Sequence, residues 1–268
     1  MYGVQIAFKN FKPSLGIWAS PWIGLSHFIR FVTYPDFIRM MRNTLSITLY
    51  SLATFPCAII LALLFNEVKN PGYKKTVQMA TYAPHFLSTV VLCSLVIMLT
   101  GSTGPINSLR TALGATTPTN LLTMPSYFST IYVWSGVWQN IGWGSIIYIA
   151  ALAGVSPELI EAARIDGAGR LRIIWHVNIP GILPTIIITL IMSIGTLLTV
   201  GFEKIYLLQN SLNLDTSRVI STYTYEIGII GGQFSYSAAI GLFNNIVNIA
   251  MIFIANIVSR RVSDVGLW

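Results

Sequence analysis

The sequence predicts an all-α integral membrane protein, and two observations favour that fold class. Of its 268 residues, 54% are hydrophobic and only 9% are charged, whereas soluble domains carry about 25% charged residues. The apolar residues gather in five stretches, each close to the ~20 residues with which a helix crosses a bilayer. No internal repeat is evident, so we expect one multi-span helical domain.

Five membrane-spanning helices are predicted, at 43–65, 79–99, 126–153, 181–200 and 237–258. None of these stretches contains Asp, Glu, Lys or Arg, and Pro84 is expected only to kink the second helix. Polar residues and turn signals lie between them, which predicts loops at 66–78, 101–125 and 202–236. Because ion-coupled carriers place ionisable groups within their spans, this pattern favours an energy source outside the spans.

The N-terminal segment, residues 1–42, contains no stretch long enough to cross a bilayer. Its part at 28–42 mixes aromatic residues with Arg30, Arg39 and Arg42, which suits a helix or turn at the membrane surface. We therefore expect an extracytoplasmic, interfacial segment over 1–42 and a membrane domain over 43–268.

Positive charges predict the orientation, because cytoplasmic loops of membrane proteins are rich in Lys and Arg. After the N-terminal segment, one side of the predicted bundle holds only Arg110, Lys204 and Arg218. The other side, which we expect in the cytoplasm, holds Lys69, Lys74, Lys75, Arg164, Arg170, Arg172, Arg260 and Arg261. Since the basic residues lie in separate loops, the net charge of +7 indicates contact with anionic lipid and not with nucleic acid.

A polar stretch at 155–184 predicts two short helices with a corner between them. Ser156 suits the N-cap of a helix over 157–166, and Gly167 suits its stop. A second helix is expected from about Gly169 until the two prolines that follow interrupt it. The sequence therefore predicts a bent cytoplasmic pair of helices between two membrane spans.

This stretch resembles the EAA loop of the membrane subunits of bacterial ABC importers. The resemblance is carried by Glu161-Ala162-Ala163, Asp166-Gly167-Ala168, Ile179-Pro180 and Leu183-Pro184. The flanking sequence, from 43 to 268, is similar to the carbohydrate branch of that family. The resemblance implies the fold of a type I importer permease, with a coupling loop at 155–180.

Members of this kind carry one further apolar helix at the N-terminus. In this chain five spans would place the basic residues of 1–42 outside the cell, against the charge rule. We therefore expect either that a further helix precedes Met1 in the full reading frame or that the first helix is missing.

The resemblance implies a permease subunit that moves a sugar by alternating access. It also implies a second permease subunit, two cytoplasmic ABC ATPase subunits, an extracytoplasmic solute-binding protein and a position in the bacterial cell membrane. The stretch 202–245 is similar to importers of oligosaccharides. ATP and Mg would be bound by the ATPase, because no GxxxxGK[ST] phosphate loop occurs here, and we expect no cofactor, metal site or catalytic residue.

Seven residues of the coupling loop are assigned by the resemblance to contact with the ATPase. The apolar ones would pack into a cleft of the ATPase, the charged ones would form ion pairs at its rim, and the glycine would set the angle. These residues are Leu159, Glu161, Ala162, Ala163, Arg164, Asp166 and Gly167. The alternatives are solvated helix pairs worth a few tenths of a kcal/mol, and a DNA-binding helix-turn-helix, which a loop tethered between two spans disfavours.

Polar and aromatic side chains in and beside the spans are candidates for the solute path, because aromatic faces stack on sugars while amides bind hydroxyls. The candidates are Trp138, Gln139, Asn140, Trp143, Glu203, Asn244, Asn245 and Asn248. A hydroxyl stripe leading to Glu203 is also predicted, from Thr185, Thr189, Ser193, Thr196 and Thr199. The alternatives are bonds between helices and an interfacial tryptophan belt.

Other functions stay open at this point. The chain could serve another solute, or it could be a membrane receptor or scaffold without transport, with which no ATPase would copurify. An enzyme is disfavoured, because no nucleophile, base and orienting group can be assembled from the polar residues.

Overall fold

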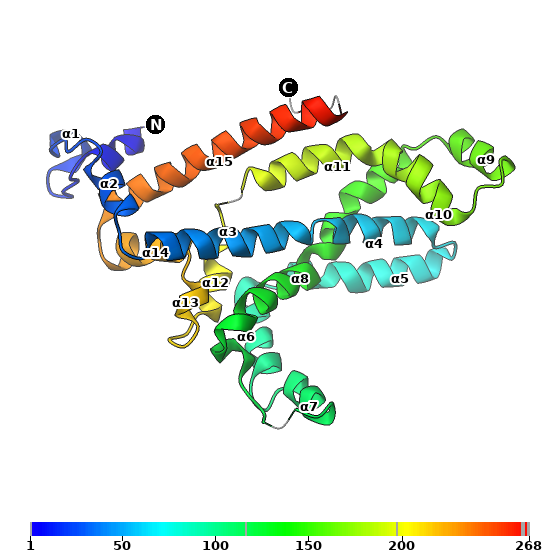
Figure 1. Ribbon diagram of the computed structural model, residues 1–268, viewed down its shortest axis with the longest axis horizontal. Coiled ribbons are helices and arrows are strands. Elements are labelled where there is room, and N and C mark those ends of the chain that lie inside the picture. Colours follow the sequence, from blue (N-terminus) through cyan, green and yellow to red (C-terminus); the bar gives the residue numbers. More distant parts are fainter. Residues whose placement is uncertain (1, 116, 197, 264–265, 267–268) are drawn as a thin grey trace. The chain divides into compact units, whose positions relative to one another are not determined.

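The computed structural model describes residues 2–115, 117–196, 198–263 and 266, and its regular elements are helices (Figure 1). Within these residues the β pairing is confined to one isolated bridge, between Lys9 and Trp22. The chain divides into two compact units. Unit 1 comprises Met1–Tyr50, Thr89–Tyr132 and Gly195–Met251, and unit 2 comprises Ser51–Ser88, Val133–Ile194 and Ile252–Trp268.

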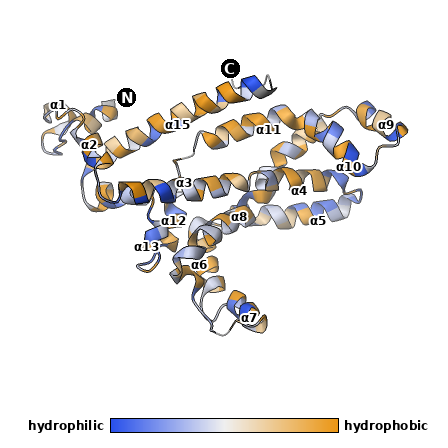
Figure 2. Ribbon diagram, viewed as in Figure 1, coloured by the Kyte–Doolittle hydropathy of each residue, from blue (hydrophilic) through white to orange (hydrophobic). Residues whose placement is uncertain are grey.

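The predicted all-α fold with up to five spans is confirmed. Four helical segments are long and apolar enough to cross a membrane: Phe37–Glu67, Thr89–Ala112, Arg170–Ile194 and Phe234–Arg261. The pair Pro125–Ala153 and Pro157–Ile165, whose two helices are bent by 74°, makes a fifth when it is counted as one span. Apolar residues dominate α4 (Pro56–Glu67), α11 (Ile179–Ile194) and α15 (Phe234–Ser263) in Figure 2.

The first span begins earlier than predicted. The N-terminal segment forms η1 (Tyr2–Phe8), α1 (Gly16–Ala19) and α2 (Ser26–Val32), and α3 (Phe37–Ala53) already includes Arg39 and Arg42. Arg39 forms ion pairs with Asp36 at 2.9 Å and with Asp215 at 2.8 Å. The two ion pairs neutralise the positive charge of Arg39, which is unfavourable near the N-terminus of a helix. Arg39 can therefore lie in α3, although the sequence composition predicts a surface segment there.

The second span is broken, which corrects both the loop at 66–78 and the simple kink. Helix α5 (Pro71–Tyr82) begins in that loop, where the side chain of Asn70 accepts a hydrogen bond from Tyr73 N at 3.1 Å. A 3₁₀ turn, η2 (Ala83–Phe86), follows, and α6 (Thr89–Thr100) starts only after two further residues. Pro84 lacks an N–H and disfavours a helical residue before it, so the helix ends instead of bending.

Short helices replace the long loops of unit 1. They are α7 (Pro105–Ala112), η3 (Leu121–Thr123), α12 (Phe202–Leu208), α13 (Leu214–Ser217), α14 (Ile220–Tyr225) and a π-helix at Glu226–Ile230. Each is too short to show a clear helical period in sequence, and a single side chain can decide where such a helix begins. Asn120, for example, accepts a hydrogen bond from Leu122 N at 3.1 Å. Two apolar clusters pack this unit, one around Phe128 and Ile205 and one around Tyr223 and Tyr236.

Unit 2 is packed around α4, α11 and the C-terminal half of α8 (Pro125–Ala153). Its buried cluster contains Ala62, Tyr148, Leu152 and Ile182. Helix α8 also approaches the backbone of α5 directly, because a Cβ on Gly142 would meet the carbonyl oxygen of Thr81. Glycine is therefore required at this crossing.

The prolines after the coupling loop do not interrupt the helix, contrary to the prediction. Helix α10 (Arg170–Ile173) continues through a π-helix at Ile174–Asn178 into α11, which contains Pro180 and Pro184. The π-helix ends two residues before Pro180, and such turns accommodate an interrupted hydrogen-bond ladder.

Helix α11 ends at Ile194, several residues before the predicted end of the fourth span at 200. Thr196 and Thr199 therefore lie beyond the helix, so the predicted hydroxyl stripe is helical only as far as Ser193. Leu197, also within the predicted span, lies outside the described residues.

Candidate functional site

The coupling loop contains a short helix, α9 (Pro157–Ile165), with the predicted start. The Ser156 side chain accepts a hydrogen bond from Glu158 N at 3.2 Å, and Pro157 occupies the first helical position. Proline tolerates that position because its missing N–H has no partner in the first turn. The sequence thus places the beginning of α9 within a residue.

The end of α9 is a Schellman motif centred on Gly167. Ala168 N donates to Ala163 O at 2.9 Å and Gly167 N donates to Arg164 O at 3.1 Å. The motif needs a left-handed residue, and Gly167 has a φ of +76°. The predicted corner is therefore a defined backbone conformation, after which the chain turns into α10, which begins at Arg170 (Figure 1).

Helix α9 has no buried residue. Leu159 is 59% exposed, Glu161, Ala162, Arg164 and Asp166 are exposed, and Ala163 is half-buried. Among the described residues, none of the charged members forms an ion pair within the chain. The exposed side of the helix is therefore open to contact with another protein.

The structure adds three exposed apolar side chains that the sequence reasoning missed. Ile165 is 87% exposed, Leu171 is 74% exposed and Trp175 is 66% exposed. All three belong to the same polar stretch as Leu159. Large apolar residues in a polar loop indicate a contact surface, and this pattern could have identified them from the sequence. Together they enlarge the apolar surface of the coupling loop.

The base of the coupling loop, in contrast, is packed. Val155 joins the buried cluster of unit 2, and a Cβ on Gly181 would lie 2.8 Å from Val155 Cγ2. Helix α11 therefore touches the residue that precedes the Ser156 cap. The base of the coupling loop is thus in contact with the helix that follows it.

Three of the predicted path residues meet at the break in the second span. Gln139 Nε2 donates to Leu87 O at 3.1 Å, which satisfies a carbonyl left over where the helix is broken. Asn140 Oδ1 lies 3.0 Å from His85 Nδ1, and the His85 ring stacks on Trp143 with centroids 4.7 Å apart and an interplanar angle of 4°. Sequence reasoning missed His85, because only the broken helix brings it to α8.

The Trp143 ring also contacts the ring edge of Phe86, at a centroid distance of 5.7 Å. Trp143 remains 47% exposed and Trp138, on the same helix, is 50% exposed. Unit 2 thus presents aromatic faces beside two amides, a combination suited to a sugar ring.

The other predicted path residues belong to unit 1 and have different surroundings. Asn248 is buried, and its Oδ1 accepts from Leu198 N at 3.0 Å while its Nδ2 donates to Thr199 Oγ1 at 3.0 Å. Both amide atoms of Asn248 are thus used in joining α15 to the chain after α11. Glu203 and Asn245 are exposed, and Asn244 is half-buried.

In the hydroxyl stripe, Thr189 Oγ1 lies 2.9 Å from the Tyr148 hydroxyl of α8 and also donates to Thr185 O at 2.7 Å. The Thr189 hydroxyl therefore bonds within the helix bundle. This arrangement fits the alternative that hydroxyls of this stripe connect helices.

Lys204 is the cation of α12, and it is half-buried. Its Nζ donates to Tyr132 O at 2.9 Å and lies 4.8 Å from the centre of the Tyr132 ring. Burial lowers the pKa of Lys204 from 10.5 to about 8. Sequence reasoning placed this residue in a loop and gave it no role.

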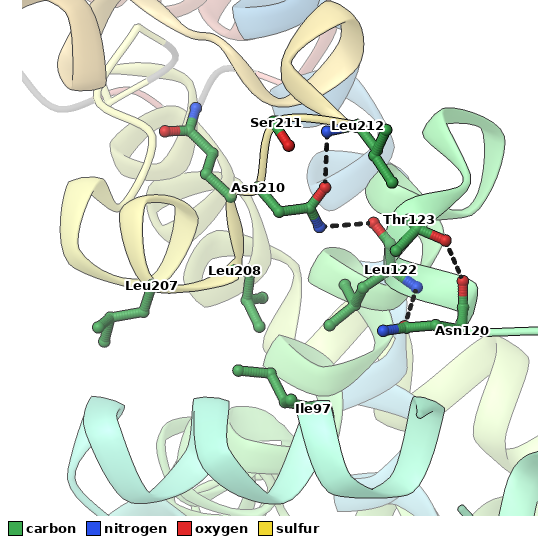
Figure 3. A pocket seen from close by; sticks show the side chains of 10 residues that line it. Ile97, Asn120, Leu122, Thr123, Leu207, Leu208, Asn210, Ser211 and Leu212 are labelled. Atoms are coloured by element: carbon green, nitrogen blue, oxygen red, sulfur yellow. Dashed lines mark hydrogen bonds between the residues drawn. The ribbon is translucent and has the colours of Figure 1, made fainter. Parts of the chain in front are cut away.

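A cavity of about 270 Å³ lies between the end of α12, η3 and Ile97 of α6 (Figure 3). The side chain of Asn210 connects two segments that line the cavity. Its Nδ2 donates to Leu122 O at 3.0 Å, and its Oδ1 accepts from Leu212 N at 2.9 Å. The amide of Asn210 is therefore occupied in joining the two wall segments. No group of three His, Cys, Asp or Glu that could hold a metal occurs in the part of the chain that the structure describes.

Residues 29–264 match the family described as binding-protein-dependent transport system inner membrane component. Protein LplB of Bacillus subtilis is 44% identical over 100% of this chain and 85% of its own length. The polygalacturonan/rhamnogalacturonan transport system permease protein YteP of the same organism is 42% identical over 100% of this chain and 84% of its own length.

Two crystal structures of other proteins are similar to this chain in both fold and sequence. The crystal structure of a bacterial ABC transporter involved in the import of the acidic polysaccharide alginate matches with a TM-score of 0.89 and 40% identity. The match covers 97% of this chain and 88% of that chain. A second crystal structure, of the bacterial alginate transporter with its alginate pentasaccharide-bound periplasmic protein, matches with a TM-score of 0.89 and 38% identity.

Proposed function

This chain belongs to the binding-protein-dependent transport system inner membrane components, and from that membership we propose that it is the permease subunit of an oligosaccharide importer. The observation that carries the proposal is the coupling loop, an exposed helix on a packed base between two membrane spans. The sugar class is supported by the relatives, since YteP is named for polygalacturonan and rhamnogalacturonan and the solved transporter for alginate.

We infer that α9 docks into a cleft of a cytoplasmic ATPase subunit. Leu159, Ala162 and Ala163 supply a narrow apolar face, and the exposed charges of Glu161 and Arg164 pair with groups at the rim of the cleft. Exposed apolar side chains beside them, including Ile165, extend the contact. The apolar face supplies affinity, because rim ion pairs in water contribute little.

When the ATPase subunits close on ATP and Mg, the docked helix moves as a lever. Its ends hold their shape, because Ser156 caps one and the Schellman motif at Gly167 fixes the other. The movement reaches α11 through the contact between Val155 and Gly181, and reorients the span. Alternating access of the bundle then follows.

The solute path in this proposal includes the aromatic and amide groups of α8. Trp138 and Trp143 stack on sugar rings, and Asn140 and Gln139 bind hydroxyls through the donors and acceptors that remain beside their bonds to His85, Gly136 O and Leu87 O. His85 orients Trp143 and Asn140 by stacking on one and bonding to the other. Discontinuous helices of transporters commonly surround such sites near the middle of the membrane.

We place the coupling loop in the bacterial cytoplasm and the short helices of unit 1, α12 to α14, on the outer side. The Lys and Arg distribution supports this orientation. An outer solute-binding protein delivers the sugar to this side, and a second permease subunit completes the path. The alginate transporter crystallised with a periplasmic protein supports the existence of such a partner.

Reconstitution tests this proposal. The chain is coexpressed with its partner permease and ATPase, purified and placed in proteoliposomes with the binding protein. Copurification of the ATPase and ATP-driven uptake of an oligosaccharide are expected. A stable chain that brings down no ATPase would instead support a membrane receptor or scaffold, and uptake of a non-sugar solute alone would refute the sugar class.

A further inference from the structure

We propose that Lys204 binds a carboxylate of an acidic oligosaccharide and thereby selects uronate-containing sugars. The inference rests on the proposed function and names its substrate class. Its basis is a half-buried ammonium group that has a carbonyl partner and an aromatic partner, and no carboxylate partner, among the described residues.

Two arginines beside α13 and α14, Arg218 and Arg39, already have carboxylate partners. Arg218 lies 2.9 Å from Glu226 and 3.8 Å from Asp36. Arg39 lies 2.9 Å from Asp36 and 2.8 Å from Asp215. These groups form a connected ion-pair network, so carboxylates of the protein already balance the positive charges of both arginines.

Arg110 donates to Asn107 Oδ1 at 2.9 Å, in a short helix of its own. Lys204 differs from all of these cations. Its Nζ makes one hydrogen bond, to Tyr132 O, among the residues that the structure describes. An ammonium has three donors, so two remain for water or for a ligand.

The surroundings of Lys204 strengthen the interaction of its ammonium group with an anionic ligand. The Tyr132 ring covers one side of the ammonium, and Cys93, whose thiol acts electrostatically on Lys204, belongs to the adjoining apolar cluster. The main cause of the lowered pKa of Lys204 is this burial. An incoming carboxylate would replace the missing countercharge, and a charge-assisted bond in a dry site is stronger than in water.

Uronic acids supply that carboxylate on a sugar ring. A neutral sugar offers only hydroxyls to the ammonium and leaves its charge uncompensated. Lys204 therefore favours the acidic member of two otherwise identical oligosaccharides. Its neighbour Glu203 is exposed, so it does not compensate the ammonium by an ion pair.

Uptake of matched sugars tests the assignment. The probes are trisaccharides of galacturonate and of mannuronate, each compared with its carboxyl-reduced neutral counterpart, in proteoliposomes holding the complete importer. The variants are Lys204→Met, Lys204→Gln and Lys204→Arg. Lys75→Met is the matched control, because Lys75 is exposed in α5 and forms no ion pair among the described residues.

Wild type is expected to prefer at least one acidic trisaccharide over its neutral counterpart. The two neutral variants should lose uptake of that acidic sugar by roughly 10- to 100-fold, the range expected for one hydrogen bond to a charged group. Uptake of the reduced sugar should change less than about twofold, and Lys204→Arg should retain most of the preference.

Three results would overturn the assignment while leaving the proposed function intact. These are a wild type that prefers neutral sugars, an equal loss for both sugars in the neutral variants, and an unchanged preference in those variants. An equal loss would identify Lys204 as a structural clamp on α8. An assembled wild type that moves no saccharide would refute the proposed function together with this inference.

Discussion

Gly181 and Val155 are in direct contact, such that a Cβ on the glycine would lie 2.8 Å from Val155 Cγ2. Gly181 is the third residue of α11, and Val155 directly precedes the Ser156 cap of α9. The neighbour is a branched side chain in a packed cluster, so it cannot turn aside as the end of a lysine could. This contact joins the loop to the span.

Gly181→Ala should therefore disturb the base of the coupling loop. The extra methyl group overpacks the contact, and we expect a loss of about 1 to 3 kcal/mol in stability with fewer sugars moved per ATP. Val155→Ala combined with Gly181→Ala should restore much of both, because it removes the clashing methyl groups. Uptake and ATP hydrolysis are measured in the same proteoliposomes. A double variant that moves no more sugar per ATP than Gly181→Ala would contradict the proposed link between the loop and the span.

Gly167→Ala tests the Schellman motif at the end of α9. Nothing lies within 4 Å of a Cβ there, so the cost is that of a left-handed alanine, about 1 to 2 kcal/mol, and binding of the ATPase should weaken. Gly169→Ala is the control, because that residue also has free space and has a φ of −71°. Equal ATPase binding by both variants in a pull-down would show that the corner geometry is unimportant.

Trp143→Ala should lower sugar-stimulated ATP hydrolysis by roughly tenfold, because it removes an aromatic face and the stacking partner of His85. Trp138→Ala should lower it as well, because the half-exposed ring offers a second aromatic face to the sugar. Trp22→Ala, in the N-terminal segment, serves as a tryptophan control. Stimulation at the wild-type level in both α8 variants would remove these rings from the path.

Asn248→Ala should act mainly on stability. It leaves Leu198 N and Thr199 Oγ1 without their partner, at a cost of about 1 to 3 kcal/mol. Asn245→Ala, at an exposed amide on the same helix, should cost little. Thermal unfolding in detergent compares the two, and an Asn248→Ala variant of normal stability with a lower sugar response would assign Asn248 to the path.

The pKa of Lys204, lowered to about 8 by burial, predicts how stability depends on pH. Below about pH 8 the folded protein carries a desolvated charge, so this residue reduces stability there. Between about pH 8 and 10.5 the folded state has lost the proton and the unfolded state has not, so stability rises with pH by about 1 to 3 kcal/mol.

Lys204→Met should remove that rise and unfold at a higher temperature than wild type at pH 7. Unfolding midpoints of the detergent-solubilised complex between pH 7 and 9.5 measure it. Lys75→Met should keep the wild-type slope. A Lys204→Met variant that is less stable than wild type at pH 7 would mean that the bond to Tyr132 O outweighs the desolvation.

The membrane spans and the coupling loop were predictable because their signals are local. Span length follows from bilayer thickness, and the ends of α9 follow from Ser156 and Gly167 themselves. The family resemblance is carried by the same loop and agrees with the match over residues 29–264. The short helices of unit 1 were missed because each is too short to produce a helical period in the sequence.

The sequence by itself determined an all-helical membrane subunit with a capped helix exposed between two spans, because composition, span length and capping act within a few residues. Only the tertiary structure decided which polar groups are already bonded and which are free for a ligand. Asn248 is occupied by backbone and hydroxyl partners, whereas Lys204 has a carbonyl and a ring, and His85 reaches Trp143 only where the helix breaks. These partners lie tens of residues apart in the chain, so their contacts exist only once the helices are packed.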